Sequence, residues 1–268
     1  MTRPSRHGPT FPTPPGTAKR RARCTPRLDV SARQVIAELS IRPAGAPAPM
    51  RVDSMRLLAG SGAEGDRHLD PLSPRQLLLA SRAGYAALLL PSQALRENLL
   101  LDEDIEHFPS GTVLQVGAEA TIRLMFACEA CGRLDLHGER LAARIGARRG
   151  VLARVIQGGV IRPGDPVRDL GQHFASWSDD WRLRIAQVLD AVPPGAVVDY
   201  AQLARLAGIQ SSYCRAFPRV LRTLGAAYAQ KAVAARTLTS LPRWTGAGLF
   251  DRDALPSSRP GSVRRSRP

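Results

Sequence analysis

The sequence predicts an α+β protein of two domains: a β-barrel-like domain followed by a small winged-helix or helix-turn-helix domain. Short apolar runs broken by Gly and Pro continue from residue 35 to residue 170, a texture typical of strands. From Trp177 the apolar residues fall at helical spacing instead. The polar stretch between the two textures predicts a linker at 171–178.

The first domain, 35–170, is expected to be a barrel or sandwich of short strands with two helices. The helices are expected at Ser81–Leu90 and Leu136–Ile145, where apolar residues recur at spacings near three and four. The expected strands are Val35–Ile41, Arg51–Leu58, Gln76–Ala80, Thr112–Val116, Thr121–Phe126, Leu152–Gln157 and Pro166–Asp169.

The second domain, 179–255, is expected to be helical. One helix starts near Trp181, and the next starts near Asp199 and ends at Gly208, which suits a C-cap position. Helix, tight Gly-containing turn and helix together are typical of a helix-turn-helix.

A further helix should follow this turn. We expect Ser211 or Ser212 to cap it and Pro218, inside it, to bend it or free a carbonyl. Its solvent side would carry Arg215, Arg219 and Arg222.

The formal net charge of +15 favours a polyanionic partner such as nucleic acid. The alternative is that much of this charge is simply solvated, because it lies in a basic arm (1–34) and a basic tail (256–268), both predicted to be disordered.

The cysteine content and the apolar segments of the sequence indicate the cellular compartment. Four scattered cysteines, Cys24 among them, suit a reducing compartment better than a disulfide scaffold. The N-terminal segment lacks the apolar core of a secretory signal, and no apolar run approaches ~20 residues. We therefore expect a cytoplasmic protein that does not contact a membrane.

A CxxC pair is the strongest chemical feature. Cys128 and Cys131 follow an apolar strand, and Arg133 lies next to them, which favours the thiolate. Such a pair serves zinc sites, redox disulfides and sulfur carriers alike. Zinc would need two further ligands, and the nearest candidate is His137.

Residues 35–170 resemble the molybdenum-cofactor-sulfurase C-terminal (MOSC) domain. The resemblance rests on several short motifs in the right order. They are Ile41-Arg42-Pro43 with Gly45-Ala46-Pro47, Gly65-Asp66-Arg67-His68, Arg96-Glu97-Asn98-Leu99, Gly111-Thr112-Val113-Leu114-Gln115-Val116-Gly117, Cys128 with Cys131, and Ile161-Arg162-Pro163-Gly164-Asp165.

The resemblance implies a domain that binds the molybdenum cofactor (molybdopterin) or carries sulfur on a thiol. Cys131 would be the functional thiol and metal ligand, with Cys128 as its companion. The chain lacks the pyridoxal-phosphate-dependent half of the large sulfurases, so a sulfur donor protein would have to supply it. The implied cofactor-binding residues are Asp66, Arg67, His68, Arg96 and Asn98, with Glu97 orienting Arg96.

Residues 181–255 resemble the DNA-binding domain of alkylguanine-DNA alkyltransferases. The matching strings are Val192-Pro193-Pro194-Gly195-Ala196-Val197-Val198-Asp199-Tyr200, Gln202-Leu203-Ala204 and Cys214-Arg215-Ala216-Phe217-Pro218-Arg219-Val220-Leu221-Arg222. The resemblance implies minor-groove binding, with Tyr200 on a phosphate and Arg215 in the base stack.

The nucleophile of that family is missing here. Its Pro-Cys-His-Arg-Val string is replaced by Tyr228-Ala229-Gln230-Lys231-Ala232-Val233, which has neither a thiol nor a base. We therefore expect no alkyl transfer. The leading hypothesis is a sulfur-handling or molybdenum-cofactor-binding protein, which would be an enzyme if it performs sulfur transfer or redox chemistry. The alternative is a non-enzymatic sensor of alkylated bases in DNA repair.

Overall fold

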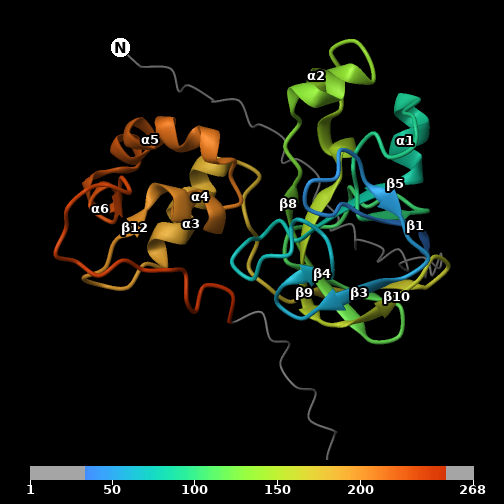
Figure 1. Ribbon diagram of the computed structural model, residues 1–268, viewed down its shortest axis with the longest axis horizontal. Helices are drawn as coiled ribbons and strands as arrows, with labels where there is room; N and C mark the ends of the chain where they lie inside the picture. The colour runs from blue at the N-terminus through green and yellow to red at the C-terminus, as the bar shows by residue number, and fades with distance from the viewer. Residues whose placement is uncertain (1–33, 252–268) are drawn as a thin grey trace, which may run out of the picture. The chain divides into compact units, whose positions relative to one another are not determined.

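The computed structural model describes residues 34–251, so nearly all of the predicted basic arm and the whole predicted tail lie outside the described residues, together with Cys24. Figure 1 shows the arrangement of the elements. The strands are β1 Ile36–Ile41, β2 Met50–Arg51, β3 Met55–Leu58, β4 Gly62–Ala63, β5 Leu77–Ser81, β6 Leu99–Leu101, β7 Thr112–Val116, β8 Ala120–Ala127, β9 Val151–Gln157, β10 Gly159–Ile161, β11 Val167–Gln172, β12 Val198–Asp199 and β13 Ala232–Val233. The α-helices are α1 Arg82–Leu88, α2 Leu141–Arg144, α3 Trp181–Asp190, α4 Tyr200–Leu206, α5 Phe217–Leu224 and α6 Ala226–Ala229, and the 3₁₀ helices are η1 Gly132–Leu136, η2 Gly146–Arg149 and η3 Ser211–Ala216.

A curled sheet is the centre of the β region. Its strand order is β11-β7-β8-β9-β5-β6-β1-β2, and β5 and β6 are its parallel pair. Val35 forms an antiparallel bridge with Pro166, and Val167 N–H donates to Gln34 O at 2.7 Å. Residues 34 and 35, just before β1, therefore contact the start of β11. These two strands lie toward opposite ends of the strand order, so the contact brings the two sides of the curled sheet together. The predicted α+β class is confirmed, with a half-barrel sheet.

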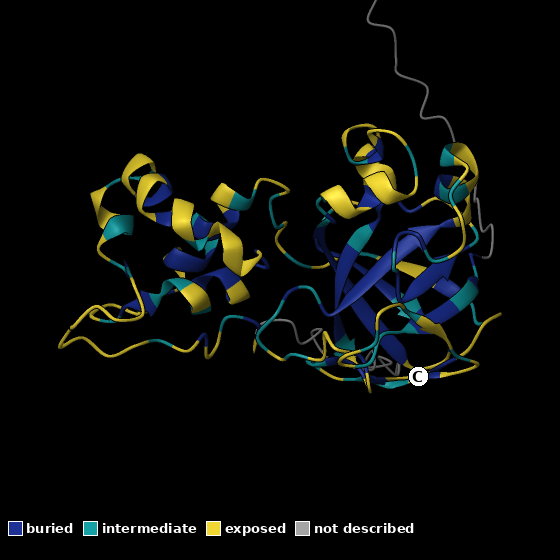
Figure 2. Ribbon diagram, turned by 45° about the horizontal axis from the view of Figure 1, so that its top comes forward, coloured by how far each residue is buried: buried dark blue, intermediate teal, exposed yellow. Residues whose placement is uncertain are grey.

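Alternating side chains of the sheet enter different cores. Leu77 and Leu79 of β5 join the cluster inside the curl, whereas Leu78 between them joins a cluster on the other face. Figure 2 shows the sheet mostly buried, with exposed residues on the helices around it. A third cluster, beneath α1 and α2, includes Ala80 and Leu141.

A β-bulge near the end of β8 changes the hydrophobic cluster into which the side chains of the strand pack. The register of β8 against β9 shifts between Leu124 and Ala127. Leu124 belongs to the cluster inside the curl, but Phe126 belongs to the cluster on the other face. Because a bulge reorients the following side chains, it sets the direction in which the chain leaves the strand.

Two predicted elements of the β region are interrupted. The predicted helix Leu136–Ile145 is wrong in extent, because the chain forms η1 and then only the short α2. Gly138 lies between them, and Arg140 adopts a left-handed φ of 48°, which breaks helical continuity. The predicted strand Arg51–Leu58 divides into β2 and β3 around Asp53 and Ser54.

The helical segment follows the predicted order with two corrections. Asp199 caps α4 by accepting from Gln202 N–H at 2.9 Å, and Gly208 follows the helix with a φ of 64°. Neither predicted serine is a cap: Gln210 precedes η3, and α5 begins only at Phe217. Pro218 is thus in the first turn of α5, where its missing N–H costs no helical hydrogen bond, so the predicted bend is absent.

The described residues all fall within one compact unit, so the predicted boundary at 171–178 stays a prediction. The strand β11 extends into this range as far as Gln172. None of the helices between residues 34 and 251 has the length and apolar character that spanning a membrane requires.

We predict that Gly150→Ala destabilises the fold strongly. Gly150 has a φ of 97°, and a Cβ there would lie 2.1 Å from the carbonyl oxygen of Leu79. The conformation alone costs an alanine about 1–2 kcal/mol, and overpacking adds about 1–3 kcal/mol. The control is Gly164→Ala, where φ is 88° and a Cβ would have nothing within 4 Å. Urea unfolding measures the free energy of unfolding of each variant. Equal losses in the two variants would contradict the packing argument.

Candidate thiol and anion site

The CxxC turn leaves β8 and carries two thiols of different exposure. Cys128 is buried, and its N–H donates to Gly150 O at 2.8 Å. Cys131 is partly exposed and immediately precedes η1. Both thiols are free. Cys131 is therefore the more accessible of the two to a bound molecule.

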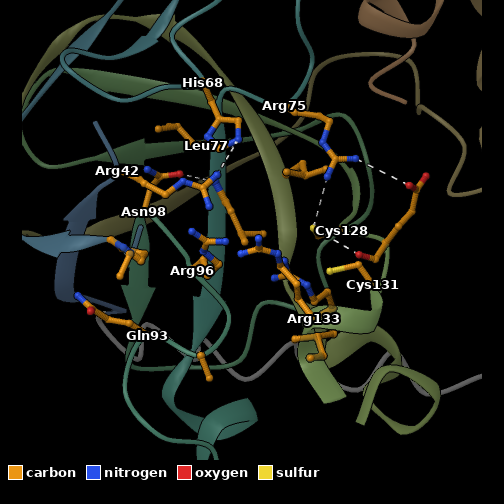
Figure 3. A pocket seen from close by; sticks show the side chains of 18 of the residues that line it. Arg42, His68, Arg75, Leu77, Gln93, Arg96, Asn98, Cys128, Cys131 and Arg133 are labelled. Atoms are coloured by element: carbon orange, nitrogen blue, oxygen red, sulfur yellow. Dashed lines mark hydrogen bonds and ion pairs between the residues drawn. The ribbon is translucent and has the colours of Figure 1, made fainter. Parts of the chain in front are cut away.

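A cavity of 660 Å³ lies in front of this turn. Five arginines, two histidines and a single glutamate face it. Figure 3 shows Cys131, Arg96 and Arg133 directed into the same space. The charged and sulfur-bearing lining residues are Arg42, His68, Arg75, Arg96, Cys128, Glu129, Cys131, Arg133, His137 and Arg149. The excess of cations makes the cavity suited to an anion.

Arg42 lies where this positive charge is most concentrated. Burial lowers its pKa to about 10, and repulsion from Arg96 and Arg67 contributes. One terminal nitrogen lies 3.2 Å from His68 Nε2, whereas the buried Nε has no hydrogen-bond partner. The buried Nε of Arg149 also lacks a partner. Because buried polar atoms are normally bonded, these two atoms indicate donors for a ligand.

Arg96 faces the thiol from the loop before β6. It has a left-handed φ of 60° and donates to Pro47 O at 2.9 Å. Burial lowers the pKa of Arg96, as do Arg133 and Arg67, whereas the negative charge of Cys131 raises it. Arg96 and Cys131 line the same cavity. A strained residue facing a cavity is typical of a functional site.

Asp66 and Asn98 organise the cationic side of the cavity from behind. The buried Asp66 carboxylate accepts from the backbone N–H groups of Arg42 and His68, both at 2.8 Å, and from Asn98 Nδ2 at 3.0 Å. Burial raises the pKa of Asp66, but the hydrogen bonds from His68 and Arg42 outweigh it, so the net shift is downward. Asn98 also accepts from Leu78 N–H at 3.0 Å.

The structure thus gathers most of the predicted MOSC residues around one cavity. His68, Arg96, Asn98, Cys128 and Cys131 line it. The other two lie behind or beside the lining: Asp66 is buried beneath it, and Arg67 is an exposed residue that acts on Arg42 and Arg96 through its charge.

The expectation that Glu97 orients Arg96 is wrong. Glu97 is buried, and its carboxylate accepts from the Tyr85 hydroxyl at 2.6 Å. Burial raises the pKa of Glu97, although this hydrogen bond and Arg149 act in the opposite direction. Arg96 points instead toward Pro47.

The predicted DNA-binding residues lie in the helical segment. Arg215, Arg219 and Arg222 are exposed on η3 and α5. Tyr200, the first residue of α4, is partly buried, and its ring meets Phe217 edge-on with centroids 5.7 Å apart. Phe250 is buried in the adjoining hydrophobic core, and Trp244 packs against that core.

Sequence reasoning missed several residues of the cavity. Arg42 belongs to the Ile41-Arg42-Pro43 motif, and this motif was the sequence signal that could have assigned Arg42 to the site. Arg75, Glu129 and Arg149 gave no such signal. Of residues 34–251, no set of three or more His, Cys, Asp or Glu side chains is placed to hold a metal ion. A metal at Cys131 would therefore need ligands from a bound molecule.

The comparisons with known proteins point to one family for the β region. The family model of the MOSC domain matches residues 66–168. No curated protein matches the chain.

Three solved structures with some similarity to this chain are each less than 25% identical to it. The YuaD protein from Bacillus subtilis is 16% identical, with 50% of this chain and 94% of that chain covered and a TM-score of 0.44. YiiM from Geobacillus stearothermophilus is 16% identical, with 70% and 99% covered and a TM-score of 0.45. YiiM from Escherichia coli is 22% identical, with 68% and 90% covered and a TM-score of 0.41.

We predict that Glu97→Gln stabilises the protein near neutral pH. The folded state raises the pKa of Glu97 above its ordinary value of 4.5, so its charge is unfavourable in the folded state at pH 7. This cost disappears as the pH falls through the raised pKa toward 4.5. Urea midpoints from pH 8 to pH 4 should therefore show an advantage for the variant that vanishes in acid.

The exposed Glu64 provides the control for this series. Glu64→Gln should shift the midpoint little at any pH. An advantage of Glu97→Gln that persists unchanged at pH 4 would be inconsistent with the proposed cause.

Proposed function

We propose that this chain, which contains a MOSC domain at residues 66–168, binds the molybdenum cofactor in the cationic cavity, with Cys131 as metal ligand or as carrier of sulfur. The observation that carries the proposal is the meeting of a partly exposed thiol with five arginines around one cavity. A phosphorylated pterin is an anion, and guanidinium groups bind phosphate with charge-assisted hydrogen bonds.

The donor atoms fit such a ligand. Arg42 and Arg149 each keep a buried Nε without a hydrogen-bond partner, and Arg96 adds a third guanidinium. These groups would hold the phosphate, while His68 and Asn98 line the same cavity. When bound, the cofactor would supply redox chemistry at its metal.

Two guanidinium groups, those of Arg96 and Arg133, line the same cavity as Cys131. A neighbouring cation stabilises a thiolate, which is the form that ligates metals and accepts sulfur. Cys128 is buried beneath the turn, with Arg75 Nη2 3.9 Å from its sulfur. In a sulfur-carrier role Cys131 would receive its sulfur from a donor protein.

We predict that Cys131→Ser lowers the metal content of the purified protein at least tenfold, because serine is a poor ligand for a soft metal site. The full-length chain is produced in a host that makes the cofactor. Its molybdenum content is measured by elemental analysis, and its pterin content by fluorescence of the oxidised pterin. Arg42→Gln should lower pterin as well as metal, since it weakens the anion site. Cys214→Ser, which alters a thiol bonded to Tyr200 O, is the matched control.

Two results would decide against this function. One is wild-type chain that retains neither molybdenum nor pterin and whose Cys131 accepts no persulfide from a sulfur donor. The other is full cofactor retention by Cys131→Ser.

The second candidate function is DNA binding by residues 179–255. One observation favours it: Arg215, Arg219 and Arg222 are all exposed within two successive helical turns of η3 and α5. Exposed arginines on one short stretch are typical of phosphate binding. The absence of a nucleophile in Tyr228-Ala229-Gln230 makes alkyl transfer no part of this proposal.

We predict that the triple change of Arg215, Arg219 and Arg222 to Ala reduces the salt dependence of duplex binding. The slope should fall by about 0.9 for each phosphate that the variant no longer neutralises. A salt-series titration by fluorescence anisotropy measures this slope, with the exposed Arg56→Ala in β3 as control.

In addition, Arg215→Ala alone should weaken binding to alkylguanine duplex more than to undamaged duplex. Equal weakening would leave only phosphate binding, and an unchanged slope would remove the DNA proposal.

A further inference from the structure

Several contacts join the thiol turn to the helical segment. Ala127 N–H donates to Asp179 Oδ1 at 2.7 Å, just before the first cysteine. Glu129, between the two cysteines, accepts from Arg184 of α3. We infer that residues 181–210 are a working part of the thiol site, and that Arg184 is the positioning residue for the turn that carries Cys128 and Cys131; the functional meaning rests on the function proposed above.

Arg184 is unusually well bonded for a residue of a surface helix. Its side chain is 0% exposed. Nε donates to Ala207 O at 2.9 Å, and Nη1 donates to Ser178 O and Asp179 O at 3.0 and 2.9 Å. Nη2 donates to Glu129, and the guanidinium lies 3.8 Å from the centre of the Phe126 ring.

Glu129 is the carboxylate that bonds the Arg184 guanidinium directly. A buried guanidinium needs a compensating charge, and Glu129 provides it. The same glutamate lies 3.8 Å from Arg75, so it links α3 to the lining of the cavity. Loss of Arg184 would release both the turn and this negative charge.

Arg75 makes a second set of contacts between the cysteine turn and the helical segment. Its Nη1 donates to Gly208 O at 3.0 Å, and its Nη2 lies 3.9 Å from Cys128 Sγ. It also lies 3.8 Å from Glu129. Figure 3 shows the Arg75 side chain directed toward Cys128, joined to it by a dashed line. Two arginines thus connect the turn to the end of α4.

The end of α4 also forms part of the cavity. Ile209 and Gln210, directly after Gly208, line it. A Cβ at Gly208 would lie 2.7 Å from the ring of Phe126 and from Pro74, so the turn packs tightly against the β region. The helical segment therefore both holds the thiol turn and closes one wall of the space in front of it.

The test is the iodoacetamide labelling rate of each cysteine in the full chain at one fixed pH, resolved by mass spectrometry. In Arg184→Met the released turn should expose the buried Cys128, so its labelling rate should rise at least tenfold relative to Cys214 in the same molecule. Cys214 is the internal reference because it lies in the helical segment and bonds Tyr200 O. Arg184→Lys keeps the charge and should restore part of the protection.

Arg182→Met is the matched control, since Arg182 is an exposed arginine on the same helix. It should leave the Cys128 rate within twofold of wild type. An unchanged Cys128 rate in Arg184→Met, or an equal rise at Cys128 and Cys214, would overturn the inference. If Arg184→Met does not fold, Glu129→Gln replaces it under the same two criteria.

These labelling rates need no cofactor, so they separate the two proposals. A wild-type chain without molybdenum or pterin would count against the proposed function while the Cys128 rates still decide the role of Arg184.

Discussion

An excess of positive charge around two thiols is the constraint on which the rest of this site depends. Five arginines face the cavity, and Glu129, the acidic residue of its lining, is paired with Arg184 and with Arg75, one of the five. Burial lowers the pKa of Arg42, and repulsion from the neighbouring Arg96 and Arg67 lowers it further. The fold maintains the arrangement because Arg42, Arg75, Arg96 and Arg149 are each held by a backbone or side-chain hydrogen bond, and an anionic ligand would relieve the repulsion.

The ties come from segments far apart in the chain. Asp66 fixes the backbone beside Arg42 and His68, Pro47 accepts from Arg96, and Leu95 O accepts from Arg149 at 2.9 Å. The bulge in β8 then directs the cysteine turn toward them. The chemistry of the site therefore depends on the sheet, whose curvature brings these loops to one place.

Much of the β region was predictable because local patterns decide it. The runs Thr112–Val116 and Thr121–Phe126 are apolar, β-branched and bounded by turn residues, and they became β7 and β8. Ser81 at the start of α1 caps it by accepting from Gly84 N–H. The motif residues His68, Arg96, Asn98 and Cys131, which the family resemblance singled out, line one cavity in the structure.

The remainder could not be predicted because it depends on partners remote in sequence. Arg184 has the appearance of an ordinary polar position on a helix, and its complete burial follows only from Glu129 and Ala207. Glu97 was misassigned because its partner, Tyr85, lies on another element. In the helical segment, the serines were plausible caps, but the chain forms a 3₁₀ turn before α5.

The bridge between Val35 and Pro166 has a consequence for how the chain emerges from the ribosome. The two residues stand at opposite ends of the β region, so the sheet cannot close until nearly all of that region has been synthesised. Until then β1 lacks its last neighbours and presents unpaired backbone groups to other nascent chains. Non-local strand pairing of this kind generally forms late in folding, so these backbone groups stay exposed longer than those of a fold built from local contacts.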